Sequence, residues 1–175
     1  MAKYQIDPSH STASFSIKHM MIAKVHGAFE KISGSLEFDP SQIEKSVVDV
    51  KIETASINTR EPQRDNHLKS ADFFDVEKYP QIIFKSTKVI PAGETLKVVG
   101  DLTIHGVTHS VTLEVDGPSA EMKDPWGNVK IGASATTQIK RKDFGLTWNA
   151  ALEAGGVLVG DDVKITLDIQ FVKQA

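Results

Sequence analysis

Apolar and polar residues alternate along several stretches of this chain, and this pattern limits the folds that it can form. In residues 163–171, VKITLDIQF, every second residue is apolar and the residues between them are polar. Successive side chains of a β-strand point to opposite faces of a sheet, so such a stretch predicts a strand with one apolar face. The same alternation occurs in 13–17, 32–38, 48–52, 82–84, 94–104, 107–115 and 129–139. The chain therefore predicts about eight antiparallel strands around one apolar interior.

Strands with one apolar face form either a sandwich or a closed barrel, and their length favours the barrel. The stretches 24–38 and 127–141 are much longer than the usual strand of about five to six residues. Gly34, Gly100 and Gly132 lie inside predicted strands, at positions where long strands can bend. We predict an all-β, eight-stranded antiparallel barrel, with residues 1–175 forming one domain. Turns are expected at 39–40, 91–93, 116–118, 125–127, 155–156 and 160–162.

The alternation stops in residues 56–84, where ionisable side chains accumulate. Pro62 stands near the start of 61–70, which is the best helix candidate in the chain. This helix would be short and polar, so we expect it to cover an end of the barrel as a lid. Phe73 and Phe74 follow it and are expected to anchor it in the barrel mouth.

Composition excludes several classes of function. The chain has 20 basic and 23 acidic residues, a balance that lacks the basic footprint of nucleic-acid binding. It has no cysteine, which excludes disulfides, thiol catalysis and cysteine-ligated zinc. No apolar run approaches the roughly 18–20 residues of a membrane-spanning helix, and the N-terminus lacks the apolar segment of a signal peptide. We expect a soluble cytoplasmic protein, or a periplasmic one if a signal peptide has been removed.

The predicted inward face is aliphatic and aromatic, with small residues at Ala13, Ala133 and Ala135. Alternation alone leaves two interpretations open, a solid core of packed side chains and a hollow tube that holds an apolar ligand. A tube could bind a long hydrocarbon chain tightly, since each buried CH₂ group contributes about 0.8 kcal/mol. The candidate lining residues are Phe15, Ile17, His19, Phe38, Val50, Ile52, Phe84, Val98, Leu113, Ile131, Ala133, Ile165, Leu167 and Ile169.

The cations of the predicted lid suggest a binding site for a polar head group. Arg64, His67 and Lys69 could hold a phosphate or amide, and Arg64 could make a bidentate contact. One alternative is a solvated surface helix on which Arg64 pairs locally with Asp65 and Asp72. Another is a hydrolytic site of Arg64, Asp65 and His67, although no nucleophile, phosphate-loop or zinc-protease motif accompanies these residues.

Three further histidines have two interpretations each. His19 continues the inward face of 13–17, where it could bind a head group or could donate to a backbone carbonyl as a core histidine. His105 and His109 would share one face of a continuous strand and so suggest a metal site. The intervening 106–108, GVT, favours a turn instead.

Residues 141–148, RKDFGLTW, are expected to form part of the barrel rim. Arg141 and Asp143 could pair there, while Phe144 and Trp148 close an end. This arrangement would be structural and not catalytic.

Short motifs resemble those of a known family, in the same order along nearly the whole chain. In the first third they are Ile6-Asp7, His10-Ser11, Phe15, Lys18-His19-Met20, Val25, Gly27 and Phe29. In the polar insert they are Ser56-Ile57, Thr59, Arg64-Asp65, His67-Leu68, Ser70, the run 72–75, Tyr79-Pro80 and Phe84. Beyond the insert they are 100–103, 106–108, Arg141, 143–145 and Trp148. Together they resemble the YceI-like family of small lipid-binding β-barrels.

The resemblance implies an extended, lipocalin-like barrel that binds long apolar chains such as polyisoprenoids, and it favours the hollow tube over the solid core. We therefore expect a non-enzymatic lipid carrier without catalytic residues, metal or cofactor, whose partner is a long-chain lipid. Contact with a membrane would be transient. A solid-core interaction module is the alternative, and a homodimer through an outer barrel face is left open.

Overall fold

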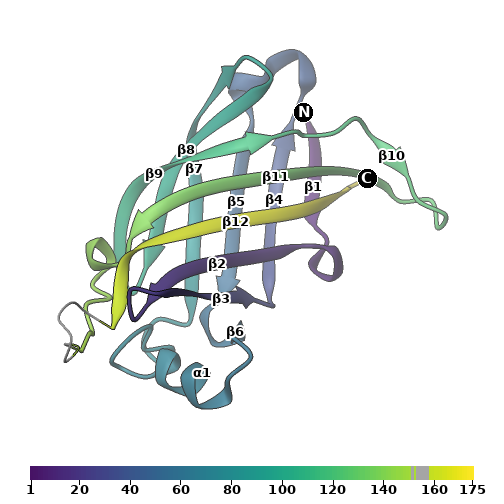
Figure 1. Cartoon of the computed structure of the whole chain (residues 1–175). Helices are drawn as coiled ribbons and strands as arrows, with labels where there is room; N and C mark the ends of the chain where they lie inside the picture. Colours follow the sequence, from purple (N-terminus) through teal and green to yellow (C-terminus); the bar gives the residue numbers. More distant parts are fainter. Residues whose placement is uncertain (151, 153–157) are drawn as a thin grey trace.

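The structure is a computed structural model that describes residues 1–150, 152 and 158–175. Its strands form one continuous antiparallel sheet (Figure 1). The strands are β1 (Ala2–Ile6), β2 (Thr12–His19), β3 (Ala23–Phe29), β4 (Ile32–Phe38), β5 (Val47–Glu53), β6 (Ile57–Asn58), β7 (Gln81–Ala92), β8 (Thr95–Ile104), β9 (Val107–Asp116), β10 (Met122–Lys123), β11 (Val129–Lys140) and β12 (Val159–Lys173). The α-helix is α1 (Pro62–Lys69), and short 3₁₀ helices are η1 (Pro8–His10), η2 (Pro40–Lys45), η3 (Thr54–Ser56) and η4 (Arg141–Phe144).

The sheet closes on itself as a barrel of eight strands. Strand β11 pairs with β9 on one side and with β12 on the other, which joins the two ends of the sheet. The order around the barrel is β11, β9, β8, β7, β5, β4, β1 and β12. Strands β2, β3 and β6 lengthen this wall, since β2 pairs with β12, as β1 does, and β3 joins β2 to β6. The predicted all-β, eight-stranded antiparallel barrel is confirmed.

The predicted long strand at 24–38 is interrupted, so the expectation of an unbroken strand is wrong. Strand β3 ends at Phe29 and β4 begins at Ile32. The backbone between them turns to the neighbouring η3, because Lys31 N donates to the Ser56 hydroxyl at 3.1 Å and Glu53 N donates to Lys31 O at 3.0 Å. The break between β3 and β4 therefore lies beside η3, which separates β5 from β6.

The turn predicted at 160–162 is also wrong, because β12 already begins at Val159. The guanidinium of Arg141 donates to the carbonyls of Val159 at 3.2 Å and Gly160 at 2.7 Å, and so holds this segment against the barrel rim. Its pairing with β2 shifts register between Val159 and Val163, which makes it an irregular strand start. The turn predicted at 155–156 lies outside the described residues.

Of the three glycines that were predicted inside strands, Gly34 is the one that another residue could replace least easily. Its φ of 156° is unfavourable for other residues, and a Cβ there would clash with the carbonyl oxygen of Asp49 on β5. Gly132 has no such requirement, since the nearest atom to an added Cβ lies 3.8 Å away.

The two ends of the barrel differ (Figure 1). Helix α1 lies across one end, which we call the lid end, and both chain termini lie toward the other, which we call the terminal end. The helix predicted at 61–70 is confirmed as α1, and the Glu61 side chain caps it by accepting from Gln63 N at 3.1 Å. Among the helices of the described residues, none has the length and apolar character needed to cross a membrane.

Asp7 fixes the break between β1 and β2. Its carboxylate accepts hydrogen bonds from Ser9 N at 3.0 Å, from the ring Nδ1 of His10 at 2.8 Å and from Lys130 Nζ of β11 at 2.9 Å. These bonds, that from Lys130 first among them, hold the pKa of Asp7 well below its usual range.

Asp7→Asn is expected to lower the free energy of unfolding by about 1–2 kcal/mol at neutral pH, because it removes the charge from these hydrogen bonds. A depressed folded-state pKa stabilises the protein above the unfolded-state pKa of about 3.9, and this contribution is lost as the pH falls below that value. Urea unfolding of both proteins across acid pH should therefore give free energies that converge. A difference that stays constant down to the lowest pH would contradict this account.

Candidate functional site

A cavity of about 460 Å³ occupies the barrel interior at the lid end. Its wall is almost wholly apolar and consists of inward side chains from most of the barrel strands. Phe15, Ile17 and Ile165 point inward, yet they keep partial exposure because empty space lies beside them. The solid-core interpretation is therefore wrong here, and the volume lies in the range of about 300–1,000 Å³ typical of ligand pockets.

The apolar space continues toward the terminal end as a second, smaller cavity of about 90 Å³. The two cavities share four wall residues, Val50, Phe84, Leu113 and Leu167. These four side chains form a constriction between the two cavities. The interior is therefore elongated along the barrel.

The structure divides the predicted lining residues between these two cavities. Phe15, Ile17, His19, Val50, Ile52, Phe84, Leu113, Ile165 and Leu167 border the main cavity. Phe38, Val98, Ala133 and Ile169 border the smaller one, together with four residues that also appear in the first set, whereas Ile131 is buried beside neither. Sequence reasoning left out several wall residues that the same alternation would have found, among them Val111, Ile139 and Val163.

Aromatic side chains attach the lid to the barrel. On one side, the ring of Phe74 packs edge-on against Phe29 at 5.7 Å, and Phe29 in turn lies 5.6 Å from Phe15. On the other side, Trp148 from the segment after η4 lies 5.3 Å from Phe73 and 4.8 Å from His67. All of these residues border the cavity, so the lid contacts form part of its wall.

Two basic residues of α1 reach the cavity. Arg64 donates from Nε to the Thr59 hydroxyl and from Nη2 to the Thr59 carbonyl, both at 2.7 Å. In the described part of the chain its Nη1 has no hydrogen-bond partner. His67 pairs through Nε2 with Asp72 at 2.9 Å, and His19 borders the same cavity from β2. The alternative in which Arg64 pairs locally with Asp65 and Asp72 is therefore wrong, since Arg64 donates to Thr59 and Asp72 pairs with His67.

Lys69 and Asp65 lie on a different side of the helix. Both border a shallow hollow on the outer surface with Glu30 and Lys31 of the strand break, and neither borders the main cavity. Asp65 accepts from Thr59 N at 2.9 Å, which gives it a structural role. Arg64, Asp65 and His67 thus do not converge on one point, as the predicted hydrolytic site would require.

The described wall of the main cavity contains no aspartate or glutamate, while Lys18 and Arg64 both border it. The lysine and arginine side chains of the described wall are therefore not matched by a carboxylate in that wall. Such an arrangement suits an acceptor, either an anionic group or a carbonyl.

Arg141 contributes to the site in a way that sequence reasoning missed. Its side chain is only 3% exposed and donates to Leu146 O at 2.6 Å and Trp148 O at 2.9 Å, besides its two bonds to β12. Burial lowers the pKa of Arg141, and Asp161 at 3.9 Å opposes this shift. The expected pair with Asp143 is wrong. Arg141 instead ties the segment that carries Trp148 to the start of β12.

The HGVTH motif begins with a turn, but the turn is shorter than the predicted 106–108, since Val107, Thr108 and His109 already belong to β9. His105 and Gly106 have positive φ angles of 55° and 73° and join β8 to β9. His109 Nε2 lies 2.7 Å from the carbonyl of Asp143, and its ring packs edge-on against Phe144 at 5.2 Å. Among the described residues, no three or more His, Cys, Asp or Glu side chains are grouped so that they could hold a metal ion.

Comparisons of the sequence and the structure with known proteins relate this chain to one family. The family model of the YceI-like domain matches residues 4–171. The UPF0312 protein SA2479 of Staphylococcus aureus strain N315 is 37% identical over 171 residues, which cover 98% of each chain. BcnA of Burkholderia cenocepacia has a TM-score of 0.80 at 26% identity, covering 94% of this chain and 98% of that one.

Two other solved structures share the fold. A Campylobacter jejuni YCEI protein has a TM-score of 0.73 at 33% identity and covers 90% of both chains. A polyisoprenoid binding domain from Saccharophagus degradans, implicated in plant cell wall breakdown, has a TM-score of 0.72 at 16% identity over 98% of both chains. Since the family model matches nearly all of the sequence and close relatives align end to end, this chain belongs to the YceI-like domain family.

Proposed function

We propose that this protein binds a long apolar lipid of the polyisoprenoid or fatty-acyl class and carries it without chemical change. The observation that supports this proposal is the cavity of about 460 Å³, whose wall is apolar along the barrel and polar only at the lid end. A related fold in Saccharophagus degradans is described as a polyisoprenoid binding domain, which supports the same ligand class.

The energetics favour a long chain over a compact ligand. Each CH₂ group transferred from water to this wall contributes about 0.8 kcal/mol, so ten such groups contribute about 8 kcal/mol before the costs of association. A net free energy near that value corresponds to a Kd of about 1 μM. A longer chain could pass the constriction at Phe84 and Leu113 and reach the smaller cavity beyond them.

The distribution of polar groups gives the bound lipid an orientation. The head group would lie at the lid end, where Arg64, His67 and His19 border the cavity. The tail would extend toward the terminal end, where the wall offers nearly no polar group. A phosphate or another oxyanion would match the donors of Arg64.

A binding role also fits the contacts of the polar residues better than catalysis does. The His67–Asp72 pair has no hydroxyl in hydrogen-bonding reach of the imidazole among the contacts of the described residues. The Thr59 hydroxyl is held by Arg64 and Asp65 and is not free to attack a substrate.

Arg64→Met is expected to weaken binding of a polyprenyl phosphate about tenfold and to change binding of the matching polyprenol less than about twofold, because it removes a charge-assisted hydrogen bond to the head group. Trp148 borders the cavity and can report binding by its fluorescence. The exposed Trp126 would first be replaced by phenylalanine so that Trp148 is the one remaining tryptophan.

Lys69→Met is the matched control, since it removes a cation from the outer side of the same helix. It should leave both affinities unchanged. Equal losses for phosphate and alcohol in Arg64→Met, or equal losses in the two variants, would contradict the assigned orientation of the lipid.

A further inference from the structure

The turn between β2 and β3 exposes three consecutive large apolar side chains. Met20, Met21 and Ile22 are 43%, 62% and 84% exposed. They form the outer point of a hairpin and belong neither to the buried core of the described residues nor to the described wall of the main cavity. Exposure of adjacent large apolar residues in a water-soluble fold has a cost and commonly marks an interaction site.

Two residues of this turn have a backbone conformation that is uncommon for residues other than glycine. The turn has three residues, 20–22, and Met20 and Met21 have φ angles of 54° and 62°, in the left-handed region that asparagine and glycine adopt most readily. Residues held in such conformations occur most often at functional sites. Asparagine or glycine would adopt these φ angles at lower cost, so the turn itself does not require methionine at either position.

Basic residues flank the apolar point. Lys18 and Lys24 are directly opposite each other in the β2–β3 pairing. No aspartate or glutamate occurs between residues 8 and 29. At the start of the neighbouring β12 strand, Asp161 is paired with Lys142 at 3.4 Å and Asp162 with Lys140 at 3.7 Å. The hairpin therefore presents positive charge beside its apolar point.

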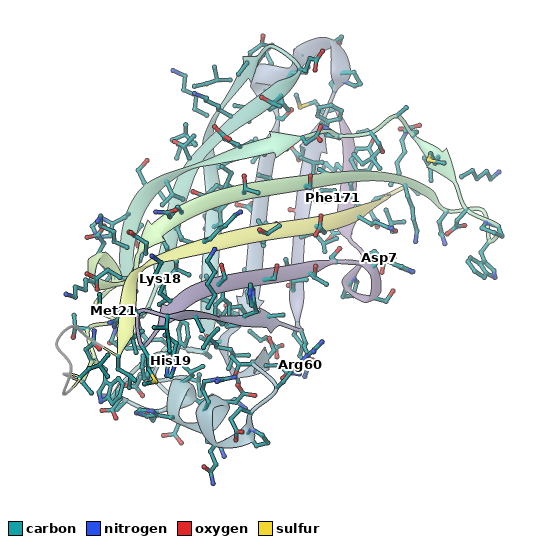
Figure 2. All side chains as sticks on the ribbon, viewed as in Figure 1. Asp7, Lys18, His19, Met21, Arg60 and Phe171 are labelled. Carbon is teal, nitrogen blue, oxygen red and sulfur yellow. The ribbon has the colours of Figure 1, made fainter. Side chains whose placement is uncertain are left out.

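This point lies next to the main cavity. Lys18 and His19, which end strand β2, both border that cavity. Figure 2 places Lys18, His19 and Met21 together at the lid end, with Asp7 and Phe171 farther along the barrel. A surface that binds the hairpin point would thus lie close to the head-group end of the site.

We propose that the hairpin point, residues 18–24, docks on a lipid bilayer that contains anionic lipids. Met21 and Ile22 would enter the boundary between head groups and acyl chains, and Lys18 and Lys24 would contact the anionic head groups. This inference rests on the proposed function for its purpose, which is to bring the cavity to a membrane that holds the lipid. The docking itself requires no bound lipid.

The shape of the point favours a bilayer over a protein partner. Three side chains on a narrow convex turn form a much smaller contact than the roughly 800 Å² per partner of a stable protein–protein interface. An apolar point with lysines at its base matches the chemistry of a membrane surface, where the apolar layer lies below a layer of anionic groups.

The test is flotation of the purified full chain with vesicles made of equal parts phosphatidylcholine and phosphatidylglycerol. The double variant Met21→Ser, Ile22→Ser is expected to lower the vesicle-bound to free ratio about tenfold or more, because two apolar side chains no longer transfer from water. Lys24→Glu is expected to lower it as well on these vesicles and to have little effect on vesicles of phosphatidylcholine alone.

The matched control is the double variant Met122→Ser, Trp126→Ser. These two residues are 71% and 84% exposed on the β10–β11 hairpin. This hairpin projects from the barrel at the right of the view in Figure 1, whereas the β2–β3 turn lies at the left. The control should float as the wild type does. Equal losses in the two double variants, or no vesicle binding by the wild type, would overturn the proposal.

Two further measurements separate docking from other causes. Light scattering should give the same molar mass for the wild type and for the double variant Met21→Ser, Ile22→Ser. If the molar mass changed and flotation did not, the hairpin point would be a self-association surface instead. Binding of polyprenyl phosphate in vesicle-free solution should be the same in both proteins. If the wild type did not bind polyprenyl phosphate in solution, the proposed function would be refuted. If the wild type did not float with the vesicles, the docking would be refuted.

Discussion

Arg141→Met is expected to lower the free energy of unfolding by about 3–5 kcal/mol, the largest single-residue effect that the contacts of the described residues suggest. The guanidinium is 3% exposed and donates to the carbonyls of Leu146, Trp148, Val159 and Gly160. Methionine fills much of the same space but donates nothing, so several poorly solvated carbonyls lose their partner. Urea unfolding at neutral pH, followed by circular dichroism, measures the loss.

Two controls show that the effect comes from these hydrogen bonds. Arg141→Lys should recover little of the stability, because one ammonium group lacks the planar array of donors that reaches carbonyls on two separate segments. Arg64→Met, which removes an arginine with fewer backbone contacts, should cost at most about 1 kcal/mol. A loss below 1 kcal/mol for Arg141→Met would contradict the structural role given to this residue.

The double variant Val163→Trp, Ile165→Trp is expected to weaken lipid binding about 100-fold or more while the barrel still folds. Both side chains point into the main cavity and keep partial exposure there. Two indole rings would occupy the volume that the lipid chain needs, and each carbon excluded from the cavity removes part of its binding free energy. Because the rings enter existing space, the change in unfolding free energy should stay within about 2 kcal/mol. Fluorescence titration with labelled polyprenyl phosphate measures binding.

The matched control places the same rings on the outer face of the same strand. Residues 164 and 166 alternate along β12 with the inner residues 163 and 165. The tryptophans of the variant Lys164→Trp, Thr166→Trp would therefore face away from the cavity. This variant should bind lipid as the wild type does. If the inner variant also retained wild-type affinity, the cavity would not be the binding site.

The sequence predicted the barrel well because period-2 alternation reports directly which face of a strand is inside. It could not decide between a filled and a hollow interior. That difference depends on the diameter and tilt of the closed barrel, which follow from the register of strands such as β9 and β11. Ala13 and Ala135 have the same sequence pattern, yet they border different cavities.

The lid shows where closer attention to helical period would have helped. Arg64 and His67 are three residues apart and share a helix face, whereas Lys69 lies five residues from Arg64 and is turned by roughly 140°. This difference explains why Arg64 reaches the cavity and Lys69 does not. Arg141 carries no such signal, since an arginine in a polar segment is normally expected at the surface.

Native mass spectrometry of protein purified gently from its natural host tests the central claim most directly. The account predicts a mass above that of the apo chain by one long apolar molecule, at close to one-to-one stoichiometry, which denaturation releases for lipid analysis. Its identity would give the chain length and head group together. An apo mass that stays unchanged after incubation with polyprenyl and fatty-acyl lipids would contradict a lipid-binding cavity.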